Sequence, residues 1–136
     1  MRLQKLQFDD LNPSLLKEIA SKDGFLALEN HGISLKTQRE MFEIQRQFFN
    51  SPDADDKDHF AYDPQTNHGF LKIGLEKLNS LQKEPDYKEA FNVRKDLLLA
   101  GQKDVIPAQW PAEKLLEFTR ACHEIVMELL RCLATP

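Results

Sequence analysis

The sequence predicts an α/β (α+β) fold in which helices pack around a few short strands. Asn12 and Pro13 open an amphipathic helix, residues 25–29 form an apolar run typical of a short buried strand, and residues 111–133 carry a long helical stripe. Short strands alternating with helical stretches are typical of mixed folds. At 136 residues the chain has the length of one domain, which we place at residues 1–136.

The N-terminal elements are predicted from capping and turn residues. Asn12 is a favourable N-cap, Pro13 suits the first helical position, and Gly24 can end the helix at positive φ. The buried strand then runs from Phe25 to Glu29, before the turn Asn30-His31-Gly32. Three apolar residues ahead of the helix alternate loosely with polar ones and indicate either an edge strand or an extended arm: Leu3, Leu6 and Phe8.

A second helix is predicted to begin after Ser34, whose hydroxyl can accept from free backbone N–H groups. Its apolar residues recur at approximate three-four spacing: Leu35, Met41, Phe42, Phe48 and Phe49. Pro52 ends it. The acidic residues 53–58 indicate a solvated helical turn, because the glycine and glutamate that an EF-hand loop requires are missing.

Residues 60–93 are predicted to form loops and short strands. A turn-rich loop at 62–67 precedes a short strand or hairpin arm at 68–74. After a break at 84–86, residues 87–93 form a candidate strand. Four of its side chains are expected on one face: Tyr87, Glu89, Phe91 and Val93.

The final helix has the clearest periodicity in the chain and follows Trp110-Pro111. It is about 22 residues, or roughly 33 Å, long. Its apolar stripe comprises Leu115, Phe118, Cys122, Ile125, Val126, Leu129, Leu130 and Leu133. The chain's two cysteines, Cys122 and Cys132, are about 15 Å apart along such a helix, too far for a disulfide. Reduced thiols are typical of a cytosolic protein, so we expect a cytoplasmic location.

Composition excludes several function classes. With 18 basic and 22 acidic residues the net charge is −4, which gives no electrostatic basis for binding nucleic acid or an anionic membrane. No run of about 18 apolar residues is present, and residues 1–10 lack the apolar core of a secretory signal. We therefore expect neither a nucleic-acid nor a membrane partner.

Known catalytic motifs are also missing. A facial-triad iron site often uses His-x-Asp, but the residues two beyond the four histidines are Ile33, Ala61, Phe70 and Ile125. His123-Glu124 begins a zincin-like helix, but Met127 occupies the place of the second ligand, so we expect His123 to be a half-buried helix residue. Phosphate-binding glycine loops and serine-nucleophile motifs do not occur. The residues alone predict no catalytic constellation.

Five strings, in order, resemble the isopenicillin N synthase-like group of iron(II)- and 2-oxoglutarate-dependent oxygenases. They cover most of the chain. The strings are Gly24 to Ile33 (similar to Gly-Phe-Phe…Asn-His-Gly-Ile), Phe48 to Pro52 with Lys57 (Phe-Phe-x-Leu-Pro…Lys, with Ser51 in place of Leu), His68 to Leu71, Asp86 to Phe91 (Asp-Trp-Lys-Glu-x-Phe), and Trp110-Pro111 before the long helix.

The resemblance implies that the chain is the N-terminal portion of a jelly-roll oxygenase, without the catalytic double-stranded β-helix core. In that family the iron ligands and an Arg-x-Ser pair that holds 2-oxoglutarate lie in the jelly roll, and no Arg-x-Ser occurs here. It therefore implies no catalytic residue, no metal ligand and no cofactor in this chain, which alone is expected to be inactive. Iron(II) and 2-oxoglutarate are implied for the complete enzyme, acting on a small organic, secondary-metabolite-like substrate.

The same resemblance places Asn67, Phe70 and Phe91 near the mouth of the substrate pocket. For both phenylalanines, core or sheet packing is the alternative. Six other motif residues are assigned structural roles: Asn30, His31, Gly32, Gly69, Glu89 and Trp110. His31 is not a metal ligand in this family, and we expect its ring to hydrogen-bond nearby backbone in the turn.

Two accounts of the chain's function remain open. In the first, it is the N-terminal domain of an oxygenase, present as a truncated product or separate piece, and it meets a small-molecule substrate only with a complete catalytic domain. In the second, it is a non-catalytic α/β interaction module that pairs with a separate jelly-roll chain or with itself. The second rests on the apolar surface of residues 25–29 and of the final helix, and on an unpaired sheet edge.

Overall fold

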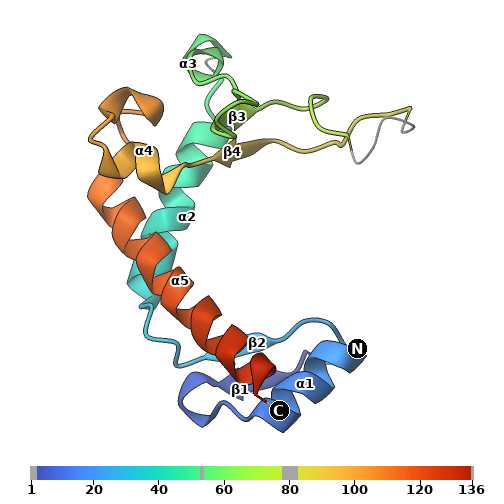
Figure 1. The fold of residues 1–136 in the computed structure, drawn as a ribbon. Helices are drawn as coiled ribbons and strands as arrows, with labels where there is room; N and C mark the ends of the chain where they lie inside the picture. The colour runs from blue at the N-terminus through green and yellow to red at the C-terminus, as the bar shows by residue number, and fades with distance from the viewer. Residues whose placement is uncertain (1–2, 53, 78–82, 136) are drawn as a thin grey trace. The chain divides into compact units, whose positions relative to one another are not determined.

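The computed structural model describes residues 3–52, 54–77 and 83–135 (Figure 1). The described part has the predicted α/β class. Its helices are α1 (Pro13–Lys22), α2 (Leu35–Phe49), α3 (Ala54–His59), α4 (Lys95–Leu99) and α5 (Ala112–Ala134), with 3-10 turns η1 (Phe8–Asp10) and η2 (Lys103–Val105). Its strands are β1 (Lys5–Gln7), β2 (Ala27–Glu29), β3 (Gly69–Leu71) and β4 (Ala90–Asn92).

The chain divides into two compact units, Met1–Gln38 with Glu117–Pro136 and Arg39–Leu116. The boundaries fall inside α2 and α5. The single domain at residues 1–136 stays a prediction.

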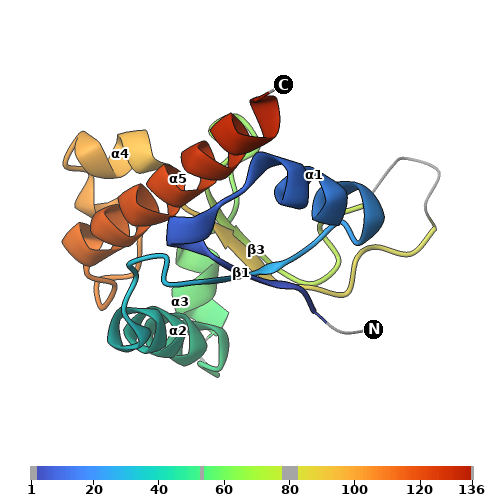
Figure 2. The ribbon, with the colours of Figure 1, turned by 90° about the horizontal axis from the view of Figure 1, so that it is seen from below.

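The first unit begins with a parallel pair of strands. β1 pairs with β2 in the register Lys5 with Ala27, Leu6 with Leu28 and Gln7 with Glu29. Parallel strands need a crossover connection, and here α1 supplies it (Figure 2). Of the two alternatives for the N-terminal residues, the structure therefore has the strand.

Capping residues set the ends of α1 as the sequence predicted. The Asn12 side chain accepts a hydrogen bond from the Leu15 N–H at 3.1 Å, and Pro13 occupies the first helical position. Gly24 follows the helix with φ of +75°, a conformation that glycine adopts without steric cost.

The core of the first unit joins β1, α1 and the C-terminal end of α5. Its buried side chains are Leu6, Leu16, Ile19 and Cys132. Figures 1 and 2 show the last turns of α5 beside α1, and the Lys17 ammonium donates to the carbonyl oxygen of Thr135. The two cysteines are free thiols, and burial raises the pKa of the Cys122 thiol.

The second unit is built on a cluster of aromatic rings around Phe48, the buried residue of the last turn of α2. The centroids of four rings lie between 5.4 and 5.6 Å from that of Phe48, in edge-on orientations: Phe49, Phe70, Phe91 and Trp110. Edge-to-face geometry places the positive ring edge against the negative ring face. The cluster thus ties α2 to β3, β4 and the start of α5.

Lys57 fastens the end of α2 onto this cluster. Its ammonium donates to the carbonyl oxygen of Phe49 at 2.8 Å and lies over the rings of Phe48 and Phe70, 6.0 and 5.6 Å from their centroids. The bond satisfies one of the carbonyls that a helix leaves unpaired at its C-terminus. The physical role of the lysine in the Phe-Phe…Lys string is therefore a helix cap.

Three of the strands are shorter than the sequence predicted. β2 spans Ala27–Glu29 rather than residues 25–29, and Phe25 is half exposed. β4 spans Ala90–Asn92 rather than 87–93, and Tyr87 is almost fully exposed. β3 is likewise confined to Gly69–Leu71. Among the described residues each strand belongs to a two-stranded sheet and its partner strand has three residues, so the ladder ends where that partner ends.

Helix positions were predicted better than their buried faces. α5 is 23 residues long, close to the expected 22, but Val126 and Leu130 of its stripe are about half exposed. In α2, Phe42 is 73% exposed although Met41 and Phe48 are buried. The expectation for His123 is wrong, because its side chain is exposed.

The acidic stretch predicted as a helical turn forms α3, with Asp53 lying outside the described residues. Among the helices described, none has the length and apolar character needed to span a bilayer.

Candidate functional site

The β3–β4 hairpin has two chemically different faces. The strands pair antiparallel, with Phe70 opposite Phe91 and Leu71 opposite Ala90. Because side chains alternate along a strand, Phe70 and Phe91 belong to one face and pack into the aromatic cluster. Leu71, Ala90 and Asn92 belong to the other face and line a pocket.

This pocket has a volume of about 560 Å³, which is within the usual range for small-molecule sites. Its apolar lining is Pro64, Leu71, Leu75 and Ala90, and its polar lining is Tyr62, Asn67, Glu76, Lys77, Lys88 and Asn92. A mixed wall of this kind fits a small polar organic molecule better than a purely apolar one.

Asn67 lines the pocket in an unusual backbone conformation. Its φ is +52°, a left-handed value that asparagine tolerates better than most residues. Its Oδ1 accepts hydrogen bonds from the Tyr62 hydroxyl at 2.9 Å and from the Asn92 Nδ2 at 3.0 Å. The Asn67 side chain is thereby hydrogen-bonded to Asn92 of β4.

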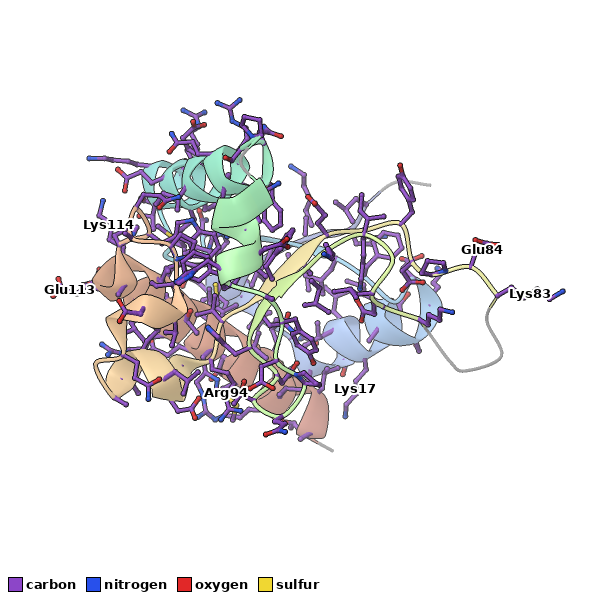
Figure 3. The ribbon with its side chains drawn as sticks, turned by 90° about the horizontal axis from the view of Figure 1, so that it is seen from above. Lys17, Lys83, Glu84, Arg94, Glu113 and Lys114 are labelled. Carbon is purple, nitrogen blue, oxygen red and sulfur yellow. The ribbon has the colours of Figure 1, made fainter. Side chains whose placement is uncertain are left out.

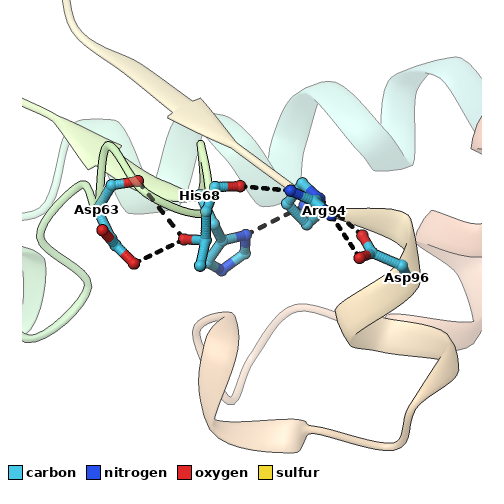
Figure 4. A network of polar contacts seen from close by, with 5 residues as sticks. Asp63, His68, Arg94 and Asp96 are labelled. Atoms are coloured by element: carbon cyan, nitrogen blue, oxygen red, sulfur yellow. Dashed lines mark hydrogen bonds and ion pairs between the residues drawn. The ribbon is translucent and has the colours of Figure 1, made fainter.

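The turn before Asn67 is held by Asp63 (Figure 4). One carboxylate oxygen of Asp63 accepts from the Gln65 N–H at 2.9 Å and the other from the Thr66 hydroxyl at 2.9 Å. These bonds to the charged form lower the pKa of the Asp63 carboxyl. At pH 7 the carboxylate therefore fixes the turn that presents Asn67.

Arg94 holds the same loop from the other side. Its guanidinium donates to the Thr66 carbonyl oxygen at 2.7 Å and pairs with the Asp96 carboxylate through two bonds of 2.7 and 2.5 Å (Figure 4). The carboxylate raises the pKa of Arg94, and the guanidinium lowers that of Asp96. A bidentate fork restricts the arginine to one orientation.

His68 joins three segments through its two ring nitrogens. Its Nδ1 accepts from the backbone N–H of Arg94 at 3.1 Å, so Nε2 carries the proton and donates to the Val105 carbonyl oxygen at 2.6 Å. The ring also meets Phe91 edge-on at 5.9 Å. Since both nitrogens are engaged, this histidine positions the hairpin and has no free lone pair for a metal.

Gly69 is required by the close approach of two backbone segments. A Cβ built at this position would lie 2.6 Å from the Phe60 carbonyl oxygen and 2.8 Å from that of Ala61. Its φ of +106° is also one that other residues rarely adopt. The glycine lets the bridge between Ala61 and Phe70 form.

The charged residues of the pocket are largely neutralised within it. Lys88 and Glu76 form an ion pair at 2.7 Å, which raises the pKa of Lys88. Lys77 has no ion-pair partner among the described residues, and its side chain is exposed. Figure 3 shows that two further charged residues, Lys83 and Glu84, lie on the loop between the strands, far from Arg94.

The Asn30-His31-Gly32 turn belongs to the other unit and closes β2. Asn30 has φ of +57° and Gly32 +82°, and the Asn30 side chain donates to the Gln7 side-chain oxygen at 2.6 Å. The His31 Nδ1 accepts from the Ile33 N–H at 3.3 Å. Ser34 then caps α2 by accepting from the Thr37 N–H at 3.0 Å. These contacts give the turn a structural role.

The described residues do not fit an iron centre. Within residues 3–52, 54–77 and 83–135, histidine, cysteine, aspartate and glutamate side chains nowhere gather in threes that could hold a metal ion.

The structure places the three residues that the resemblance assigned to substrate contact on two faces of the hairpin. Asn67 lines the hairpin pocket, whereas Phe70 is buried and Phe91 half-buried in the aromatic cluster, and their contact with a substrate stays a prediction. Trp110 belongs to the same cluster, and Glu89 is exposed just before β4. Sequence reasoning chose Phe91 rather than its neighbour Asn92, although side-chain alternation along a strand puts Asn92 on the opposite face.

Comparison with known proteins gives the chain its family. Residues 6–113 match the family model described as "non-haem dioxygenase in morphine synthesis N-terminal". The "2-oxoglutarate-Fe(II) type oxidoreductase ppzD" of Metarhizium rileyi is 26% identical in an alignment that covers 82% of this chain and 36% of that protein. Its counterpart from Metarhizium majus is 27% identical in an alignment that covers 88% of this chain and 41% of that protein.

Solved structures show the same fold. The crystal structure of a full-length Neurospora crassa protein in complex with alpha-KG matches 97% of this chain and 46% of its own, with a TM-score of 0.70 and 22% identity. A second structure of the same Neurospora crassa protein, with alpha-KG and thymine, has a TM-score of 0.69 and 21% identity.

The chain thus spans less than half the length of these relatives. The match over residues 6–113 confirms the predicted resemblance: the chain belongs to the N-terminal domain family of the non-haem, iron(II)- and 2-oxoglutarate-dependent oxygenases.

Proposed function

We propose that this chain is the substrate-side domain of a 2-oxoglutarate- and iron(II)-dependent oxygenase that oxidises a small organic molecule in the cytoplasm. The iron and 2-oxoglutarate sites belong to sequence outside these 136 residues, and the chain alone has no turnover. In the complete enzyme, iron(II) and 2-oxoglutarate would supply the O2-dependent oxidation chemistry, with succinate and CO2 as co-products. The residues of this chain bind and orient the substrate.

The observation that carries the proposal is the two-faced hairpin. One face is anchored in the aromatic cluster by Phe70 and Phe91, and the other presents Asn92 beside Asn67 in a pocket of about 560 Å³. Rigid packing behind a binding wall keeps its polar groups in place when a ligand arrives. Because the chain belongs to an oxygenase family, we assign this wall to substrate binding.

Metal and cosubstrate titration of the purified chain tests the proposal. We expect no stoichiometric binding of iron(II), no binding of 2-oxoglutarate, and no succinate when both are supplied with O2. Sequencing the transcript beyond codon 136 should reveal an in-frame His-x-Asp motif or, for a separately encoded partner, a stop. Stoichiometric iron binding coupled to succinate formation by this chain alone would overturn the proposal.

The alternative is a non-catalytic α/β interaction module that pairs with a jelly-roll chain or with itself. It is favoured by large apolar side chains that remain exposed, among them Phe25, Leu35, Phe42 and Tyr87. Size-exclusion chromatography and hydrophobic-dye binding test it. A concentration-dependent dimer, or a complex with a separate jelly-roll chain, would favour this alternative, whereas a dye-silent monomer would oppose it.

A further inference from the structure

The amide of Asn67 is only half used by the protein. Its Oδ1 accepts two hydrogen bonds, from Tyr62 and from Asn92, which fills the capacity of an amide oxygen. Its Nδ2 has no partner among the described residues, although it carries two protons. Asn67 is exposed and lines the pocket, so this donor is available to a ligand.

The amide of Asn92 is used in the opposite sense. Its Nδ2 donates to Asn67, and its Oδ1 has no partner in the described part of the chain. The pair therefore offers one free donor and one free acceptor. If both amides rotated together, the two residues would exchange these roles, and one donor and one acceptor would still be free.

The remaining lining limits what this pair can recognise. Leu71, Leu75 and Ala90 give the pocket an apolar wall, and Glu76 and Lys88 neutralise each other, while Lys77 has an exposed side chain and no ion-pair partner among the described residues. This lining favours a ligand with a compact apolar body and one polar edge that combines a hydrogen-bond acceptor with a donor. A carboxylate or an ammonium group can form only one of two hydrogen bonds with the amide pair, because the pair offers one donor and one acceptor.

From these contacts we infer that the pocket selects small cyclic amides, meaning lactams and ureides that carry an N–H next to a carbonyl. The Asn67 Nδ2 donates to the ligand carbonyl, and the Asn92 Oδ1 accepts from the ligand N–H. This inference rests on the proposed function, because it names the substrate class of the same site. It gives Tyr62 a positioning role, which is to hold the Asn67 oxygen and leave its nitrogen free.

Binding to the ¹⁵N-labelled chain, without iron or 2-oxoglutarate, tests the inference by NMR. The probes are δ-valerolactam, its N-methyl derivative, which lacks the N–H, and δ-valerolactone, which has a ring oxygen in place of the N–H. We expect δ-valerolactam to shift the side-chain amide signals of Asn67 and Asn92 and to bind about tenfold more tightly than either analogue, the effect of one lost hydrogen bond.

The Asn67→Asp variant removes the donor while keeping the shape of the residue, its tolerance for positive φ and both accepted hydrogen bonds. We expect it to bind δ-valerolactam at least about tenfold more weakly. Asn30→Asp is the matched control, because Asn30 has φ of +57°, the same charge change applies, and it lies outside the pocket. Its affinity for the probe should be unchanged.

Three results would overturn the inference: no binding of δ-valerolactam, equal binding of the three probes, or equal loss of affinity in the two variants. None of them bears on the proposed function, which depends on iron, succinate and the transcript. Conversely, turnover by the chain alone would overturn the proposed function while the probe titration still reported on the amide pair.

Discussion

Replacing Phe48 by alanine should destabilise the second unit more than any other single truncation of a ring in the cluster. The side chain is 3% exposed, and its ring is edge-on to Phe49, Phe70, Phe91 and Trp110 at 5.4 to 5.6 Å. Truncating a buried phenylalanine to alanine costs about 3–5 kcal/mol, and lost aromatic pairs favour the upper half of that range. We therefore expect the free energy of unfolding to fall by about 4 kcal/mol.

The same substitution at Phe42 is the matched control. Phe42 lies on the same helix, six residues before Phe48, but its side chain is 73% exposed. Alanine removes little buried area there and has a slightly better helix propensity than phenylalanine. The free energy of unfolding should change by less than about 0.5 kcal/mol.

Trp110 provides a local assay, since it is the only tryptophan in the chain and lies in the cluster, 5% exposed. Urea unfolding followed by its fluorescence therefore reports on the second unit. With an m value of about 2 kcal/mol/M, Phe48→Ala should lower the midpoint by about 2 M. Equal midpoints for Phe48→Ala and Phe42→Ala, or a shift below about 0.5 M for Phe48→Ala, would refute the reasoning.

Three further predictions address single contacts. Gly69→Ala should lower the free energy of unfolding by at least about 2 kcal/mol, because the alanine Cβ would lie 2.6 Å from a backbone oxygen. Gly101→Ala should lower it less, because a Cβ there meets nothing within 4 Å. Equal melting temperatures for the two variants would contradict this. Lys57→Met keeps the apolar stem but loses the hydrogen bond that caps α2. Urea titration should show a free energy of unfolding lower by about 1–2 kcal/mol, and an unchanged value would contradict the capping role. The free energy of unfolding should fall as the pH drops below the ordinary carboxyl pKa values of 4.5 for Glu29 and 3.8 for Asp63. Hydrogen bonds in the folded state lower both pKa values, so the unfolded chain binds more protons in this range. Thermal melts should show a weaker acid dependence for Asp63→Asn, and an unchanged dependence would exclude a contribution from Asp63.

Local signals in the sequence were sufficient to place the helix ends. Asn12, Gly24 and Ser34 act through hydrogen bonds or φ values within a few residues of themselves, and the structure has each of them where it was expected. The long stripe before the C-terminus likewise predicted α5 to within a residue or two. Such features depend little on the rest of the chain.

Strand lengths and α4 could not be predicted in the same way. A strand extends only as far as its partner, and the partners of β2 and β4 lie in distant parts of the sequence, as the pairs Leu6 with Leu28 and Phe70 with Phe91 show. A run such as Tyr87 to Val93 carries strand-favouring residues at alternate positions, but only three of its residues pair with another strand. The five-residue helix Lys95–Leu99 has no periodic stripe of its own and was missed.

The site shows the same division between local pattern and tertiary pairing. The resemblance named Asn67 but chose Phe91 rather than Asn92 on the facing strand, because the amide contact between Asn67 and Asn92 joins residues 25 apart and has no local signature. It also grouped Phe70 and Phe91 with Asn67, although strand alternation turns both rings to the other side of the hairpin. A hairpin register is needed before the two faces can be told apart.

That alternation lets stability and ligand recognition be varied separately at neighbouring positions. Phe91 and Asn92 are adjacent in sequence, yet one packs against Trp110 at 4.8 Å and the other holds Asn67 at 3.0 Å. A change at Phe91 should therefore lower the urea midpoint first, and lose ligand affinity only as the hairpin loosens. A change at Asn67 that keeps its accepted hydrogen bonds should do the reverse. If variants on the two faces altered stability and affinity in constant proportion, the hairpin would act as one undivided unit, and the pocket could not be assigned a recognition role of its own.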